Sequence, residues 1–169
     1  SSIAYIEGFY YFPRIDKEIL KEHKEGLICL SGPINSPIGH ALLEGTEENA
    51  TEEILWYKEI FQDDFYFEVQ RHPLLDEDLS ILRKEAWVYQ KAESYAKRQE
   101  IYIQKVRELS TKYNIKCVAT NDTHYLNKED WKGHEILLNI QSGEPCEIWE
   151  RDLQGNPRFR VPNPKRKNY

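Results

Sequence analysis

The most informative stretch of the chain reads VATNDTHY and spans residues 118–125. An apolar run from Ile115 to Ala119 leads into it and ends in a polar cluster that contains Asp122 and His124. This layout is typical of the carboxyl end of a buried β-strand, where α/β folds place their functional groups. We therefore expect residues 115–119 to form a buried strand of an α/β fold.

Asp122 and His124 lie two residues apart, so on an extended backbone both side chains point to the same side. A carboxylate oxygen and an imidazole nitrogen in that arrangement can hold one divalent metal ion. The alternative interpretation is that Asn121 and Asp122 begin a turn and that His124 is an ordinary loop residue. The spacing alone leaves both interpretations open.

Two further apolar runs predict strands. Leu27–Ser31, which lies between two glycines, and Phe65–Gln70 are too short for helices and are typical of buried strands. Periodic or capped stretches predict helices over residues 17–24, 38–44, 47–61, 79–113 (one helix or two) and 128–140. Strands that alternate with helices form a parallel sheet with right-handed connections, so we expect about three parallel strands with helical crossovers.

The carboxyl ends of parallel strands meet at one edge of a sheet. Three polar segments, Ser31–Pro33, Arg71–His72 and Asp122–His124, follow the predicted strands. We therefore expect these segments to converge, and this expectation rests on the predicted fold and not on sequence spacing.

Five motifs occur in a recognisable order: GLICLSG (26–32), WYKEIF (56–61), FYFEVQRH (65–72), VATNDTHY (118–125) and HEILLNIQSG (134–143). In this order they resemble the PHP (polymerase and histidinol phosphatase) domain of bacterial DNA polymerase III alpha subunits. The resemblance covers residues 1–143 and is interrupted at about 73–99, which we interpret as a helical insertion. Residues 144–169 contain several prolines and glycines, so we expect a mostly irregular tail that leads toward the next domain.

The resemblance implies a fold and a site. PHP domains are distorted (β/α)7 barrels, of which this chain would hold the last few units. Their sites bind divalent metals (Zn, Mn or Mg), which activate a water molecule for attack on a phosphodiester. Asp122 and His124 match the last two metal ligands, and His72 matches a histidine that can ligate metal or support a ligand. Pro33 stands where the family usually has a cysteine ligand, and the ligands of the first half of the domain are not in this chain.

The resemblance also implies a role. We expect a fragment of a replicative DNA-directed DNA polymerase, a nucleotidyltransferase, in which this part is a structural scaffold without catalysis of its own. The alternative is a metal-dependent phosphoesterase or 3′–5′ proofreading exonuclease in the full-length protein. The expected partners are the rest of the alpha subunit, the proofreading exonuclease subunit, DNA through the parent protein, and a second copy of the isolated fragment.

Composition restricts the other possibilities. The 169 residues carry a net charge of −6, which argues against a free-standing nucleic-acid binder. No apolar run approaches the ~20 residues of a membrane span, and no glycine-rich phosphate loop is present. Cys29 and Cys117 lie in predicted strands, so we expect buried thiols in the reducing cytoplasm. The chain lacks Met and opens with two serines in residues 1–9, which we predict to be the end of a helix, so we expect an excised fragment.

Overall fold

The computed structural model describes residues 2–74, 86–163 and 165. The chain divides into two compact units, Ser1–Asn121 and Asp122–Tyr169, which we call unit 1 and unit 2.

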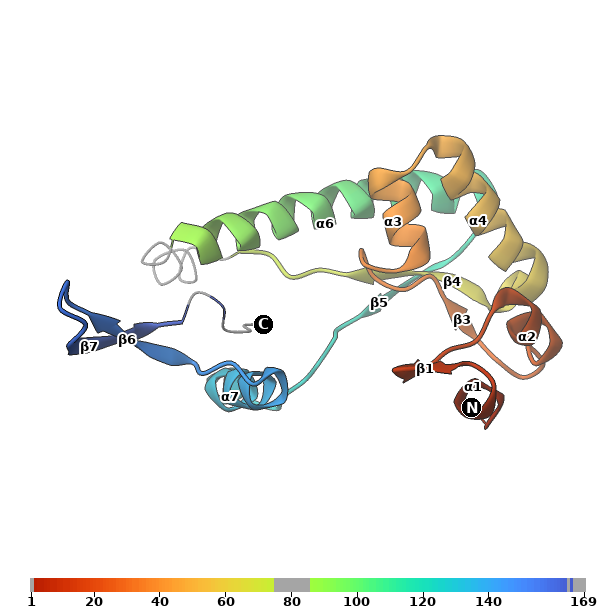
Figure 1. The fold of residues 1–169 in the computed structure, drawn as a ribbon. Coiled ribbons are helices and arrows are strands. Elements are labelled where there is room, and N and C mark those ends of the chain that lie inside the picture. Colours follow the sequence, from red (N-terminus) through yellow and green to blue (C-terminus); the bar gives the residue numbers. More distant parts are fainter. Residues whose placement is uncertain (1, 75–85, 164, 166–169) are drawn as a thin grey trace. The chain divides into compact units, whose positions relative to one another are not determined.

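Unit 1 contains a parallel sheet of three strands (Figure 1). The strands β3 (Cys29–Leu30), β4 (Phe65–Gln70) and β5 (Cys117–Thr120) follow one another in space in this order. Leu30 pairs with Tyr66 and Gln70 pairs with Thr120, both in parallel register. The predicted α/β fold with three parallel strands and helical crossovers is confirmed.

Helices make both crossovers. The connection from β3 to β4 contains α3 (Pro37–Glu44), α4 (Glu47–Phe61) and the short η1 (Gln62–Asp64), and the connection from β4 to β5 contains α6 (Ala86–Tyr113). Side-chain caps define where the first two begin: the Ser36 hydroxyl accepts from Gly39 N–H and the Thr46 hydroxyl from Asn49 N–H. The described part of the predicted 79–113 helix is one continuous helix, and residues 75–85 lie outside the described residues.

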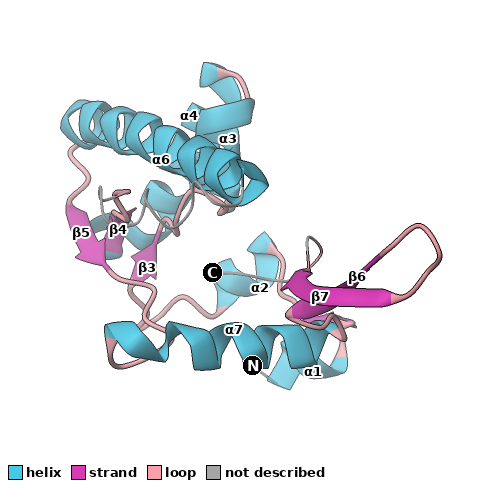
Figure 2. Cartoon of the chain, turned by 90° about the vertical axis from the view of Figure 1, so that its left-hand side faces the viewer, coloured by secondary structure: helices cyan, strands magenta, loops and turns pink. Residues whose placement is uncertain are grey.

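Helices α3, α4 and α6 cover one face of the sheet (Figure 2). Phe65 and Phe67 of β4 point into a buried cluster with side chains of α3, α4 and α6, among them Ile54, Tyr102 and Val106. Burying each large apolar side chain contributes roughly 1.5–3 kcal/mol. Because successive side chains of a strand point to opposite faces, the alternate residues of β4 lie on the face away from these helices.

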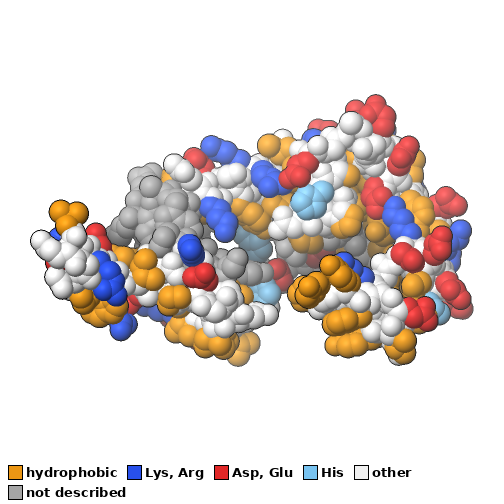
Figure 3. Space-filling model, viewed as in Figure 1, with side chains coloured by type: hydrophobic (Ala, Val, Ile, Leu, Met, Phe, Trp, Pro, Cys, Tyr) orange, Lys and Arg blue, Asp and Glu red, His pale blue; other side chains and the backbone are white. Residues whose placement is uncertain are grey.

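The N-terminal segment of unit 1 comprises α1 (Ser2–Ile6), β1 (Phe9–Tyr10), β2 (Phe12–Pro13) and α2 (Lys17–Glu22). β1 and β2 pair as a short antiparallel hairpin. Figure 3 shows hydrophobic side chains gathered on the surface over α1 and β1. The large apolar residues that are more than half exposed in this segment are Tyr5, Ile6, Phe9, Tyr10, Tyr11 and Phe12.

Unit 2 contains η2 (Lys128–Asp130), α7 (Trp131–Ser142), β6 (Glu147–Arg151) and β7 (Pro157–Pro162). Asn127 and Asp130 form a capping box at the start of the helical segment, and Gly143 ends α7 in the left-handed conformation, with φ of 72°. The helical segment begins at residue 128 as predicted and ends at Ser142, two residues later than predicted.

The structure differs from the irregular tail expected after residue 143. β6 and β7 form an antiparallel ribbon in which Ile148 pairs with Val161. The turn is closed by the Asp152 carboxylate, which accepts from the N–H groups of Gln154 and Asn156, each at 2.9 Å. In a two-stranded ribbon both strands are edges, where proline is tolerated, so the prolines do not prevent pairing.

No helix among residues 2–74, 86–163 and 165 is long and apolar enough to cross a membrane.

Candidate functional site

In unit 1, the carboxyl ends of the three strands meet at one edge of the sheet. Ser31 and Gly32 follow β3, His72 lies two residues beyond the end of β4, and Asn121 follows β5. The parallel pairing of the strands brings these three ends to the same edge. The predicted convergence of Asp122–His124 with the other two segments stays a prediction, because Asp122 and His124 belong to unit 2.

Tyr102 of α6 ties the ends of β3 and β4 together. Its hydroxyl donates to the carbonyl of Gly32 at 2.9 Å and lies 3.3 Å from the carbonyl of Glu68 and 3.2 Å from the hydroxyl of Ser31. The Ser31 hydroxyl in turn accepts from Glu68 N–H at 2.9 Å. The side chain of Tyr102 is fully buried, and this burial raises its pKa to about 12. Tyr102 is therefore a neutral hydrogen-bond donor at any physiological pH.

Glu68 links β4 to β5 through its carboxylate. One carboxylate oxygen accepts from the Gln70 amide at 3.2 Å and from the Thr120 hydroxyl. Thr120 is the last residue of β5, so this contact fixes the strand at the end from which the 121–124 segment begins. Together with the backbone contacts of Glu68 to Ser31 and Tyr102, it makes Glu68 the residue that joins all three strand ends.

His72 is held through its backbone. Its N–H donates to Oε1 of Gln99 at 2.7 Å, although the residue itself is exposed. Gln99 lies on α6 and is only 3% exposed. Sequence reasoning placed Tyr102 and Gln99 in a predicted helix and identified neither as a functional residue. The available signal was the position of Gln99 three residues before Tyr102, on the same face of the helix.

In unit 2, Asp122 and His124 lie together. The distance from His124 Nε2 to Asp122 Oδ2 is 3.3 Å. The His124 ring stacks on the ring of His134 from α7, with centroids 5.0 Å apart and an interplanar angle of 13°. His134 also contacts Tyr125, with ring centroids 5.8 Å apart. The side chains at 122 and 124 therefore point to the same side, as expected from their spacing.

The distance between these two donor atoms fits a metal ion. Two ligand bonds of about 2.0–2.1 Å at a tetrahedral angle separate an oxygen and a nitrogen donor by about 3.3 Å. Asp122 and His124 can thus supply two adjacent positions of a tetrahedral site. Among the side chains that the structure describes, no group of three or more His, Cys, Asp or Glu is arranged to hold a metal ion. His72 belongs to unit 1, and Pro33 has no side-chain donor.

Cys29 and Cys117 differ in their exposure to solvent. Cys29 is partly buried and packs against the core, and burial raises its pKa to about 11. Cys117 is exposed, so the expectation that it is a buried thiol is wrong. The reason is its position on β5, which is an edge strand of the sheet.

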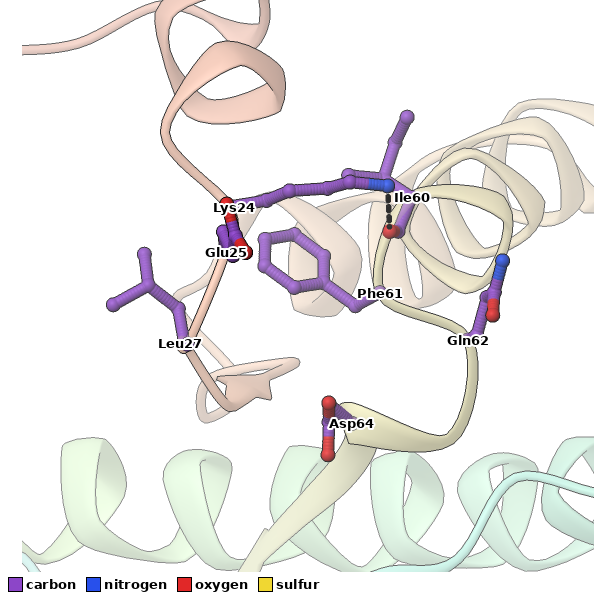
Figure 4. Close-up of a pocket in the computed structure, with 8 residues that line it drawn as sticks. Lys24, Glu25, Leu27, Ile60, Phe61, Gln62 and Asp64 are labelled. Carbon is purple, nitrogen blue, oxygen red and sulfur yellow. Dashed lines mark hydrogen bonds between the residues drawn. The ribbon is translucent and has the colours of Figure 1, made fainter.

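A separate pocket of about 360 Å³ lies at the opposite edge of the sheet, beside the start of β4 (Figure 4). Lys24 lies over it and donates to the carbonyl of Ile60 at 2.9 Å, at the C-terminal end of α4. The lysine thus satisfies a carbonyl that a helix end leaves unpaired, which is a structural role.

The fold and the strand-end geometry agree with the comparisons to known proteins. Residues 1–72 match the family model described as PHP domain. The chain therefore contains PHP-domain sequence, in an α/β arrangement consistent with part of a (β/α) barrel.

Several bacterial proteins are similar to the chain over most or all of its length. The chain is 46% identical over 169 residues to the DNA polymerase III subunit alpha of Chlamydia muridarum and 43% identical to that of Chlamydia trachomatis serovar D; both matches cover 100% of the chain. The subunit of Borreliella burgdorferi is 39% identical over 143 residues, or 85% of the chain. Over its whole length the chain is thus similar to a segment of DNA polymerase III alpha subunits, and its first 72 residues match the PHP domain model. It spans 13% of the length of the two chlamydial relatives.

Proposed function

We propose that this chain serves DNA replication as a structural segment of a polymerase alpha subunit and has no catalytic activity on its own. The observation that carries this proposal is the hydrogen-bond network of Tyr102. It engages polar groups of Ser31, Gly32 and Glu68 in contacts within the protein. Polar groups that are hydrogen-bonded to one another at the strand ends are better suited to a rigid scaffold than to binding a metal ion.

Two further features support a scaffold. Pro33 offers no donor atom where the resembling family usually has a ligand. The Asp122–His124 pair can supply two of the four ligands that a tetrahedral metal requires. A catalytic metal site normally needs three protein ligands and one open position for water, so the pair is incomplete without residues from elsewhere.

The test compares two variants in the full-length protein. Asp122→Asn combined with His124→Ala removes both donors and should leave DNA synthesis unchanged. Tyr102→Phe removes the network donor and should lower the stability of the PHP segment. A metal-dependent phosphodiester cleavage that disappears in the Asp122→Asn/His124→Ala variant would contradict the scaffold proposal.

The alternative is a metal-dependent phosphoesterase or 3′–5′ proofreading exonuclease in the full-length protein. The observation that favours it is the distance of 3.3 Å between Asp122 Oδ2 and His124 Nε2. Asp122 and His124, with His72 as a proposed further ligand, would hold Zn, Mn or Mg. A bound metal would lower the pKa of a water molecule for attack on a phosphodiester. Elemental analysis after loading with zinc or manganese, on wild type and on Asp122→Asn/His124→Ala, tests this binding.

The proposed partners follow from the relatives. Most of an alpha subunit lies outside a segment of this size, so we propose that the rest of that subunit is the principal partner. Contacts with the proofreading exonuclease subunit, and with DNA through the parent protein, are further proposals, as is a location in the cytoplasm. The exposed aromatic residues over α1 and β1 favour self-association of the isolated chain, which light scattering at high concentration would detect.

A further inference from the structure

We propose that Gln99 is a positioning residue that fixes the backbone of His72 at the carboxyl end of β4. The distance from His72 N to Gln99 Oε1 is 2.7 Å, and the two residues lie 27 positions apart in the chain. The contact therefore joins a helix to a strand end and is not a local turn. This role goes beyond the proposed scaffold function and does not depend on whether the site binds metal.

Gln99 has a defined place from which to act. It lies one helical turn before Tyr102, and residues three apart share a face of a helix. The Tyr102 hydroxyl itself donates a hydrogen bond to the carbonyl of Gly32, just after β3. One turn of α6 thus carries two buried polar side chains, one for the end of β3 and one for the segment that follows β4.

His72 is restrained from both of its sides. Its N–H is engaged by Gln99, and the residue after it is Pro73. The residue before a proline is confined to extended conformations, because the proline ring clashes with its backbone in the helical region. The backbone of His72 is therefore fixed, while the residue as a whole remains exposed.

The energetics indicate positioning and not stabilisation. Because Oε1 of Gln99 accepts from His72, the other amide atom is a donor. This buried Nε2 has no hydrogen-bond partner among the described residues. An unmatched buried donor costs at least as much free energy as a typical hydrogen bond contributes, so Gln99 should add little net stability. A side chain that holds a neighbour without stabilising the fold has an effect that can be separated from stability by experiment.

The experiment measures hydrogen exchange by mass spectrometry in the full-length protein, on peptides that cover His72. Gln99→Met keeps the length of the side chain but has no strong acceptor. We expect it to speed exchange of the His72 amide at least tenfold, with an unchanged or raised thermal midpoint. Gln99→Glu keeps an acceptor oxygen at the same position and should restore most of the protection.

Gln99→Asn is the matched control that tests whether the length of the side chain matters. It keeps the amide but is shorter by one bond of about 1.5 Å, so it should behave like Gln99→Met. Unchanged exchange at His72 in Gln99→Met would overturn the proposal. A uniform rise in exchange throughout unit 1, together with a lower thermal midpoint, would also overturn it, because Gln99 would then be an ordinary stabilising residue.

The affinity for Mn²⁺, measured on the same samples, separates this proposal from the proposed metal site. A lower affinity in His72→Ala that is not seen in Gln99→Met would count against the positioning role. Wild-type protein without Mn²⁺ binding would contradict the metal proposal alone, and the exchange of the His72 amide would then decide the role of Gln99.

Discussion

The hydroxyl of Tyr102 donates to the carbonyl of Gly32 across 2.9 Å, which joins the middle of α6 to the residue two positions after β3. Gly32 has a positive φ of 74°, and a Cβ built on it would lie 2.6 Å from the Cβ of Ser36. The tight turn that follows β3 therefore needs glycine, and the Tyr102 hydroxyl satisfies its carbonyl. The hydrogen bond from Tyr102 therefore holds the turn after β3 against α6.

Tyr102→Phe should destabilise the chain by about 1–3 kcal/mol, because it leaves buried acceptors without their donor. Urea unfolding of wild type and variant measures the difference. The matched control is Tyr113→Phe, since the hydroxyl of this partly exposed tyrosine makes a long contact of 3.5 Å to Thr51 and a contact to the exposed Lys112, outside the buried network. We expect less than about 0.5 kcal/mol for the control, the usual range for substitutions away from buried networks. Equal losses in both variants would mean that the Tyr102 network adds nothing specific.

The raised pKa of Tyr102 predicts a loss of stability in strong base. Burial raises the pKa of this phenol to about 12 in the folded chain, whereas an unfolded tyrosine titrates near 10. The folded state therefore holds its proton more tightly, so this contribution is complete below about pH 10 and is lost as the pH rises through about 12. We expect a decline of about 2–3 kcal/mol over that window.

The measurement is the urea midpoint of the chain at pH 9, 10, 11 and 12, with Tyr102→Phe as the control that lacks the phenol. Cys29, whose pKa burial raises to about 11, adds a decline of the same sign at slightly lower pH. Because Cys29 is present in both proteins, the pH dependence of the urea midpoint reports on Tyr102 only through the difference between wild type and Tyr102→Phe. If the urea midpoints of the two proteins fell equally with pH, the phenol of Tyr102 would have the same pKa in the folded and unfolded chain.

The contact between Thr120 and Glu68 predicts a coupling between β5 and β4. Thr120→Val keeps the shape of the side chain but removes the hydroxyl that donates to the Glu68 carboxylate. Because both residues are partly exposed, we expect a loss of about 1 kcal/mol in unfolding free energy. Thr120→Ser retains the hydroxyl and should recover most of that loss. A double-mutant cycle with Glu68→Ala should give a coupling of similar size, and a coupling of zero would exclude a meaningful contact.

The sequence predicted the elements whose signal is local. Periodicity identified α4, and the short apolar runs identified β3, β4 and β5, because burial against helices imposes those patterns directly. The same reasoning was wrong for residues 147–162, where Pro157 and Pro162 suggested an irregular tail. The pairing of Ile148 with Val161 and the turn around Asp152 overcome that local signal.

The candidate site was only partly predictable for a related reason. The positions of Asp122 and His124 at the end of a strand follow from local spacing, and the structure places their side chains together. The contact from Gln99 to His72 depends on how α6 lies along the sheet, which no local pattern encodes. Helix periodicity can place Gln99 on the buried face but cannot name its partner.

The exposure of Cys117 predicts selective modification. Cys117 lies exposed on the edge strand β5, whereas Cys29 is partly buried with a pKa of about 11. Only the thiolate reacts with N-ethylmaleimide, and at pH 7.5 a thiol with that pKa is ionised to less than about 0.1%. We expect Cys117 to be labelled at least tenfold faster than Cys29, as read by mass spectrometry of the peptides that carry each residue. Cys117→Ser should remove the fast label and leave the rate at Cys29 unchanged. If Cys29 reacts as fast as Cys117, the packing of β3 against the helices is looser than the structure indicates.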